Sequence, residues 1–159
     1  MKSNEFVYTT YIRTTPEKVW SAITNPEFCR QYWVHVNISD WKKGSKWQHI
    51  NENSKACMIE GEIVESLPSK RLVMTWAEPG SKAKASRLTF EIEKIQDTVK
   101  LSVVHVDLEG EMAGKVSVGW PLVLSSMKTF LETNKALDTW GLNRHAAKLA
   151  FPFACDDAF

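Results

Sequence analysis

One long helical segment lies near the end of a chain that otherwise has the pattern of consecutive β-strands, and this order limits the folds available to it. Within residues 119–131, large apolar side chains recur at helical spacing and form one stripe. The stripe consists of Trp120, Leu124, Met127 and Leu131. Pro121 is expected in the first turn of this helix, where a missing N–H costs nothing. Because one amphipathic helix on a sheet can leave a cavity between the two, the pattern favours a small-molecule pocket.

The N-terminal part predicts one strand and two short helices. Residues 5–13 alternate and are rich in Val, Tyr, Thr and Ile, which is typical of a strand. Thr15 and Pro16 then form a helix start, with Thr15 as the N-cap and proline at the first helical position. This helix ends at Asn25, and a second short helix is expected over residues 26–31.

Six further strands follow. They are expected at residues 34–41, 45–51, 56–66, 70–78, 85–95 and 98–107. The connections are short and contain turn-forming Gly, Pro, Asn and Asp, which favours antiparallel pairing of neighbouring strands. The order therefore predicts an α+β fold, in which a curved antiparallel sheet of about seven strands wraps around the C-terminal helix.

Alternation along the strands indicates which side chains face that helix. The residues expected on the inner face are Leu72, Met74, Trp76, Leu88, Phe90, Ile92, Leu101, Val103 and His105. His105 thus continues an apolar row, where it either orients a ligand or exchanges a proton, or is a core histidine bonded to a backbone carbonyl or to Asp107. His49 lies on the same side as Trp47, either converging with His105 or facing solvent.

Two carboxylates, Glu60 and Glu62, stand two residues apart on one predicted strand. Such a pair would suit acid–base chemistry on either side of a bond. Ile59 and Ile63 form the better core face, however, so the two glutamates are expected to point outward. Gly61 between them indicates a bulge or a close approach of another backbone segment.

Bulk properties exclude several classes of function. The 159 residues are 43% hydrophobic and 25% charged, as in a globular domain, and carry a net charge of +1 without basic clusters. Nucleic-acid binding therefore lacks its electrostatic signature. No apolar run is long enough to span a membrane, and three widely spaced cysteines fit a reducing compartment, so the cytoplasm is expected. Metal-ligand spacing, a nucleophile elbow and a phosphate loop are all missing from the sequence.

The chain is expected to form one domain over residues 1–136, followed by an aromatic extension over residues 137–159. Trp140, Phe151, Phe153 and Phe159 lie in this extension. So many aromatic side chains predict docking on the domain itself or on a neighbouring copy, which makes a homodimer one expected arrangement.

Several ordered strings of residues carry a resemblance to a known family. They are Thr15-Pro16-Glu17-Lys18-Val19-Trp20, Ile23-Thr24-Asn25-Pro26-Glu27 and Trp33; Gly61-Glu62-Ile63-Val64-Glu65, Pro68, Arg71-Leu72 and Thr75-Trp76; and Leu101-Ser102-Val103-Val104-His105, Gly119-Trp120, Leu124 and Met127-Lys128. Over about residues 5–135 the chain resembles the activator-of-heat-shock-protein-90-ATPase-like family, within the START-like, birch-pollen-allergen-like (SRPBCC) helix-grip superfamily. The resemblance implies a helix-grip fold with a cavity. It leaves the activity open, because the superfamily includes lipid carriers, hormone binders, cyclases and co-chaperone modules.

The leading hypothesis is binding of a small hydrophobic or aromatic molecule between the sheet and the C-terminal helix, with no catalytic residue, metal or cofactor. The residues expected to line the site are Trp33, Trp47, His49, Trp76, Phe90, His105, Trp120, Leu124 and Met127. One alternative is a co-chaperone-like module of the stress response that stimulates a partner ATPase or chaperone. Another is a cyclase, dehydratase or hydrolase acting on a hydrophobic substrate, with His105 as acid or base.

Overall fold

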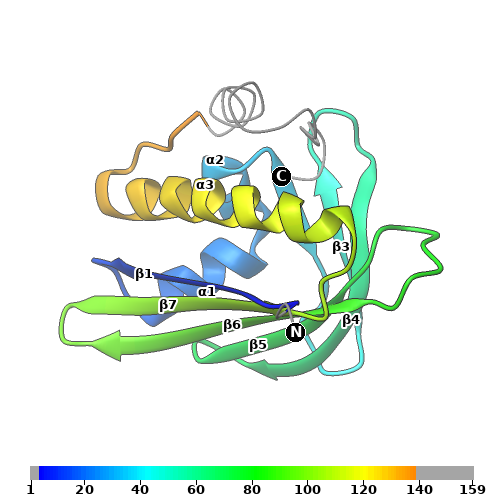
Figure 1. Ribbon diagram of the computed structural model, residues 1–159. Helices are drawn as coiled ribbons and strands as arrows, with labels where there is room; N and C mark the ends of the chain where they lie inside the picture. The colour runs from blue at the N-terminus through cyan, green and yellow to red at the C-terminus, as the bar shows by residue number, and fades with distance from the viewer. Residues whose placement is uncertain (1–3, 139–159) are drawn as a thin grey trace.

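The computed structural model describes residues 4–138, in which a curved sheet wraps around one long helix (Figure 1). The elements in chain order are β1 (Phe6–Ile12), α1 (Pro16–Thr24), α2 (Pro26–Tyr32), β2 (His35–Ile38), β3 (Lys46–Asn51), β4 (Cys57–Leu67), β5 (Arg71–Trp76), β6 (Ser86–Ile95), β7 (Thr98–Val106) and α3 (Glu111–Thr133). The strands form one sheet with the order β1-β7-β6-β5-β4-β3-β2, and each neighbouring pair is antiparallel. The predicted α+β helix-grip fold is confirmed.

The two short helices begin where the sequence predicts, and α2 ends at Tyr32, one residue beyond its predicted end. The Thr15 hydroxyl accepts a hydrogen bond from the Lys18 backbone N–H at the start of α1. Asn25 ends α1 and also caps α2, since its side-chain oxygen accepts from the backbone N–H groups of Glu27 and Phe28. One asparagine therefore ends the first helix and caps the second.

The long helix α3 begins eight residues before the expected segment 119–131. The expectation that Pro121 lies in the first turn is wrong, because this proline lies in the middle of the helix. Gly114 and two β-branched valines lower the helix propensity of residues 111–118, which hid this stretch from the sequence pattern. Packing onto the sheet stabilises the N-terminal half instead, through the buried side chains of Val116 and Trp120.

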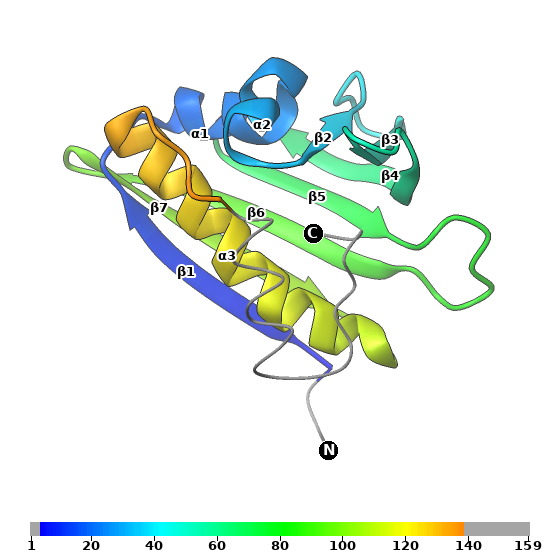
Figure 2. The same cartoon turned by 90° about the horizontal axis from the view of Figure 1, so that it is seen from above.

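The core fills the space between the inner face of the sheet and α3. All the residues predicted for the inner face of β5, β6 and β7 are buried. Val116, Trp120, Val123, Leu124 and Met127 bury the facing side of α3. Seen from above, α3 runs obliquely over β7 and β1, and α1 and α2 lie on the same side of the sheet (Figure 2). The three helices thus cover one face of the sheet, while the other face carries ion pairs such as that of Arg71 with Glu91.

The predicted extension over residues 137–159 lies almost entirely outside the described range. Within that range, the backbone N–H of Leu137 donates to the Ser126 hydroxyl of α3. The docking of the extension and the homodimer stay predictions. Among the helices of residues 4–138, none combines the length and apolar character needed to cross a membrane.

Candidate functional site

The nine residues predicted to line the site lie together in the interior, and all are buried. Trp120 of α3 is at their centre, with ring centroids 5.7 Å from Trp76, 5.6 Å from Phe90 and 6.3 Å from Trp33. Such distances are typical of packed aromatic pairs. His49 faces this interior and not solvent, with its ring 4.6 Å from that of Trp33. The residues form one cluster, whose role in binding stays a prediction.

His105 is hydrogen-bonded inside the protein at both ring nitrogens. The Ser86 hydroxyl donates to the Trp76 carbonyl (3.1 Å), so it accepts the bond from His105 Nε2 (2.8 Å). The Trp120 indole N–H donates to His105 Nδ1 (3.3 Å). The imidazole is therefore neutral, with its proton on Nε2, and its lone pair is already used. This arrangement favours a structural role over the acid–base role considered for an enzyme.

The hydrogen-bond partners of His105 differ from those predicted from the sequence for a core histidine. A backbone carbonyl or Asp107 was expected, but the partners are the side chains of Ser86 and Trp120. Asp107 instead forms an ion pair with Lys84 (3.3 Å). Asp107 has a positive φ of 59°, so the regular strand alternation ends before it.

Burial lowers the pKa of His105 from 6.5 to about 4, because the protonated ring would lose its hydration. His105 therefore binds a proton more tightly in the unfolded chain than in the folded protein. Its contribution to the stability of the folded state is complete above pH 6.5 and is lost as the pH falls toward 4. We expect the free energy of unfolding to decrease by about 2 kcal/mol between pH 7 and 5 on this account. Urea unfolding at several pH values should show a shallower pH dependence for His105→Gln. An unchanged pH dependence would contradict this assignment.

Two polar residues of β2 also enter the interior, and the sequence analysis missed them. The ring of His35 stacks on that of His49, with centroids 4.5 Å apart and planes 9° from parallel. His49 Nδ1 lies 2.8 Å from the side-chain oxygen of Asn37, whose amide nitrogen donates to the Ile23 carbonyl. His35 Nε2 lies 3.4 Å from the Asn51 amide nitrogen. Each histidine of β2 and β3 is thus paired with an asparagine of the other strand.

The register contains the signal that could have revealed this arrangement. His35 lies opposite Asn51, and Asn37 lies opposite His49. In antiparallel strands directly opposite side chains share a face, so the two polar pairs can be recognised once the pairing is fixed. The sequence alone shows the alternation of each strand but not which residues are opposite.

Between the sheet and α3 the structure leaves a small cavity of about 10 Å³. Its lining consists of Ile23, Tyr32, Trp33, Asn37, Phe90, Trp120, Val123, Leu124 and Met127. Five of these residues were predicted for the site from the sequence. A cavity of this size holds about one water molecule. Among the described residues, the space at this cavity is therefore nearly filled. Beside it lies a buried indole N–H, on Trp33, that has no hydrogen-bond acceptor in the described part of the chain.

A second hollow, of about 270 Å³, opens at the N-terminal end of α3. Trp76 and Ser86 lie at its inner side, and both contact His105. Its rim carries charged side chains from three places: the connection between β5 and β6, the end of β7 and the first turns of α3. The charged residues are Glu78, Lys84, Asp107, Glu109, Glu111 and Lys115. We call this hollow the α3 cleft.

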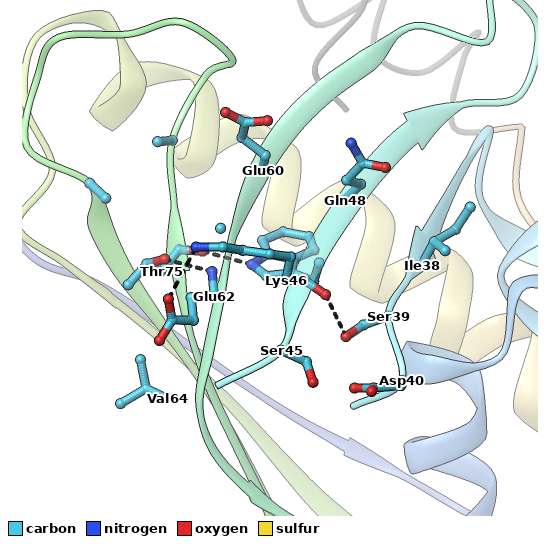
Figure 3. A pocket seen from close by; sticks show the side chains of 14 residues that line it. Ile38, Ser39, Asp40, Ser45, Lys46, Gln48, Glu60, Glu62, Val64 and Thr75 are labelled. Carbon is cyan, nitrogen blue, oxygen red and sulfur yellow. Dashed lines mark hydrogen bonds and ion pairs between the residues drawn. The ribbon is translucent and has the colours of Figure 1, made fainter. Parts of the chain in front are cut away.

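A third hollow, of about 1010 Å³, is an open groove on the outer face of β3, β4 and β5 (Figure 3). Gln48 and Glu60 extend from one part of it, and Lys46 forms an ion pair with Glu62 in another (3.2 Å). The outward direction predicted for Glu60 and Glu62 is confirmed. Among the predicted site residues, only Trp47 lines this groove. Within residues 4–138, no three His, Cys, Asp or Glu side chains are placed to hold a metal ion.

Gly61 permits a close backbone approach beside this groove, as the sequence predicts. It lies opposite Trp47 in the β3–β4 ladder. The Trp47 indole N–H passes over it and donates to the carbonyl of Thr75 (2.8 Å). A Cβ atom on Gly61 would lie only 2.0 Å from that oxygen. The absent side chain is therefore what allows β3, β4 and β5 to close together here.

Comparison with known proteins places this architecture in a family. A family model described as "Activator of Hsp90 ATPase homolog 1-like protein" matches residues 13–132. No curated protein sequence matches the chain.

Solved structures share the fold at low sequence identity. The Hsp90 activator PFC0360w from Plasmodium falciparum has a TM-score of 0.65 and 22% identity over 80% of this chain and 95% of its own. The Aha1 dimer from Colwellia psychrerythraea has a TM-score of 0.68 and 17% identity over 83% of this chain and 98% of its own. DynU16, a protein of the dynemicin biosynthetic locus, has a TM-score of 0.68 and 16% identity over 84% of this chain and 49% of its own. With the family model covering most of its length, the chain belongs to the activator of Hsp90 ATPase homolog 1-like family.

Proposed function

We propose that the chain binds a small aromatic molecule between the sheet and α3, in a conformation in which α3 lies farther from the sheet. The observation that carries the proposal is the indole N–H of Trp33. It is buried beside the small cavity and has no acceptor among the described residues. A buried donor without an acceptor costs about 1–3 kcal/mol, which a purely structural core has no reason to retain. An oxygen atom of a ligand would supply the acceptor.

The surroundings of Trp33 suit an aromatic ligand. Phe90 and Trp120 offer ring faces and edges, and Met127 has an unbranched side chain that adapts to different shapes. Ligand sites commonly combine such apolar walls with a few convergent polar groups. The chemistry favours a fused-ring compound with one hydroxyl or carbonyl oxygen. The presence of DynU16, from a biosynthetic locus, among proteins of this fold fits a role with a small molecule.

Binding requires the interior to open, because the cavity of about 10 Å³ holds no such compound. The N-terminal half of α3 has features that weaken the helix locally. Its N-cap, Gly110, makes no side-chain capping bond, and Gly114 faces open space. Pro121 has no N–H to complete the helical hydrogen bond of the preceding turn. These features lower the free energy needed to move residues 111–120.

Trp33→Phe tests the proposal, since it removes the N–H and keeps an aromatic ring. We expect the melting temperature to change little, because no hydrogen bond within the described residues is lost. The affinity for 2-naphthol, followed by tryptophan fluorescence, should fall about tenfold through loss of one hydrogen bond. The affinity for naphthalene, which has no oxygen, should stay the same. Equal affinities of wild type and variant for 2-naphthol would contradict the proposal, as would no binding to wild type.

Trp47→Phe is the matched control. Its indole N–H donates to the Thr75 carbonyl, away from the cavity. This variant should lose stability by about 1–3 kcal/mol through an unsatisfied buried carbonyl. Its affinity for 2-naphthol should remain that of the wild type. The two variants thus separate binding from folding with the same chemical change.

A second candidate is a co-chaperone-like module that stimulates an ATPase of the Hsp90 class. The match of the family model over residues 13–132 and the similarity to an Hsp90 activator favour it. It predicts that the chain accelerates ATP hydrolysis by the Hsp90 of its own organism and that Trp33→Phe stimulates equally well. An unchanged ATPase rate over a wide range of concentrations would reject it.

A further inference from the structure

We infer that the α3 cleft is the entrance to the interior and that the ion pair between Lys115 and Glu78 holds it closed. This inference rests on the proposed function and adds the route by which a ligand arrives. It starts from the position of the cleft. Trp76 lines the cleft, and its ring also lies 5.7 Å from that of Trp120 and 5.3 Å from that of His105. Trp76 therefore separates the cleft from the aromatic cluster around the small cavity.

Two ion pairs connect the walls of the cleft. Lys115 of α3 bonds Glu78, at the start of the connection between β5 and β6 (2.8 Å). Lys84, near the end of the same connection, bonds Asp107, which follows β7 (3.3 Å). Figures 1 and 2 show this connection projecting beyond the end of the sheet. Opposite charges thus attach a projecting segment to α3 and to β7, across the cleft.

The two halves of α3 are held differently, and this favours opening at the cleft. In the C-terminal half, Ser126 donates to the Tyr32 carbonyl (2.8 Å) and Lys128 to the Tyr11 carbonyl (2.7 Å). Glu132 accepts from the Arg13 backbone N–H (3.0 Å). These bonds attach the C-terminal half to α2 and to the end of β1.

The N-terminal half is joined to its surroundings through side chains that can separate. Lys115 forms the ion pair with Glu78, and Trp120 donates to His105. The side chain of Lys115 is 14% exposed, so salt screens its pair less than a fully exposed one. These two contacts, from Lys115 and Trp120, are among those that hold this half, and both lie beside the α3 cleft, before Pro121. Movement of residues 111–120 about this proline would separate α3 from the connection and uncover Trp76.

Lys115→Met tests the inference, since it removes the charge and keeps an apolar stem of similar length. We expect faster amide hydrogen exchange over residues 111–120, measured by mass spectrometry without any ligand. In stopped-flow fluorescence with 2-naphthol, the association and dissociation rate constants should both rise about two- to fivefold. Their ratio should stay constant, because the pair is present in both the free and the bound closed state. Lys46→Met, which breaks the Lys46–Glu62 pair on the outer face, is the control and should change neither.

The possible results separate this inference from the proposed function. Faster exchange together with faster binding in Lys115→Met supports the entrance. Faster exchange with unchanged binding rates rejects the cleft as the route, while the proposed function stands. Unchanged exchange rejects the ion pair as the closing contact. If 2-naphthol fails to bind the wild type, the proposed function is rejected and the entrance with it, whatever the exchange shows.

Discussion

Gly61→Ala is expected to lower the free energy of unfolding by about 3–6 kcal/mol. The new Cβ would lie 2.0 Å from the Thr75 carbonyl oxygen and 2.6 Å from the Trp47 indole nitrogen. The first contact is with backbone, so the strands must separate, and the second breaks the bond between Trp47 and Thr75. The expected loss is a large part of the 5–15 kcal/mol that a domain of this kind possesses. Urea unfolding followed by tryptophan fluorescence measures it directly.

Gly114→Ala makes the same chemical change where space is available and serves as the control. A Cβ at Gly114 meets no atom within 4 Å. In a helix, alanine is favoured over glycine by about 1 kcal/mol, so this variant should be more stable than the wild type. Opposite signs for the two substitutions are expected. A stability of Gly61→Ala within about 1 kcal/mol of the wild type would mean that β4 relaxes without cost.

Trp120→Ala is expected to lower the free energy of unfolding by about 3–5 kcal/mol, because it leaves a large cavity at the centre of the aromatic cluster. Trp120 is 1% exposed and packs against Trp33, Trp76 and Phe90. The substitution also removes the donor to His105 Nδ1. Chemical unfolding of the purified variant is the measurement.

Two further variants separate packing from hydrogen bonding at Trp120. Trp120→Phe keeps most of the ring volume and loses the N–H, so its stability should lie between those of the wild type and Trp120→Ala. Trp20→Ala removes a partly exposed tryptophan from α1 and should cost much less. If Trp120→Ala retained wild-type stability but no longer bound 2-naphthol, Trp120 would be a wall of the site and not part of the core.

The sequence predicted the sheet well because the alternation of β5, β6 and β7 is nearly regular. It predicted the C-terminal half of α3 for a similar reason, since Leu124, Met127 and Leu131 repeat at helical spacing. Residues 111–118 were missed because Gly114 and two valines weaken the local preference for helix. Their helical state is imposed by contact with the sheet. A local sequence pattern cannot predict a helix whose stability arises only from contact with the assembled strands.

For the candidate site, the sequence identified the interior residues but not how tightly they fit. The tryptophans Trp33, Trp76 and Trp120 could either enclose a cavity or fill it. The outcome depends on their rotamers and on the distance between α3 and the sheet, and residue spacing in the sequence gives neither. His35 and Asn37 were missed because Val34, Val36 and Ile38 alternate with them and suggest an inner face of their own. The pairing with β3 decides between the two faces, and pairing is a property of the assembled sheet.

That pairing has a consequence for the specificity of folding. β2 (His35–Ile38) is a short strand at the edge of the sheet, and its apolar residues Val36 and Ile38 would also fit the inner face. A slip of one residue would exchange its faces, which moves His35 and Asn37 to the face that Val36 and Ile38 occupy and separates each from its partner in β3. Several registers of β2 against β3 would bury similar amounts of apolar surface. The two imidazole–amide pairs thus select one of these registers. Any change of a histidine in this part of the interior therefore calls for a matching change of the asparagine opposite it, so the two positions should vary together.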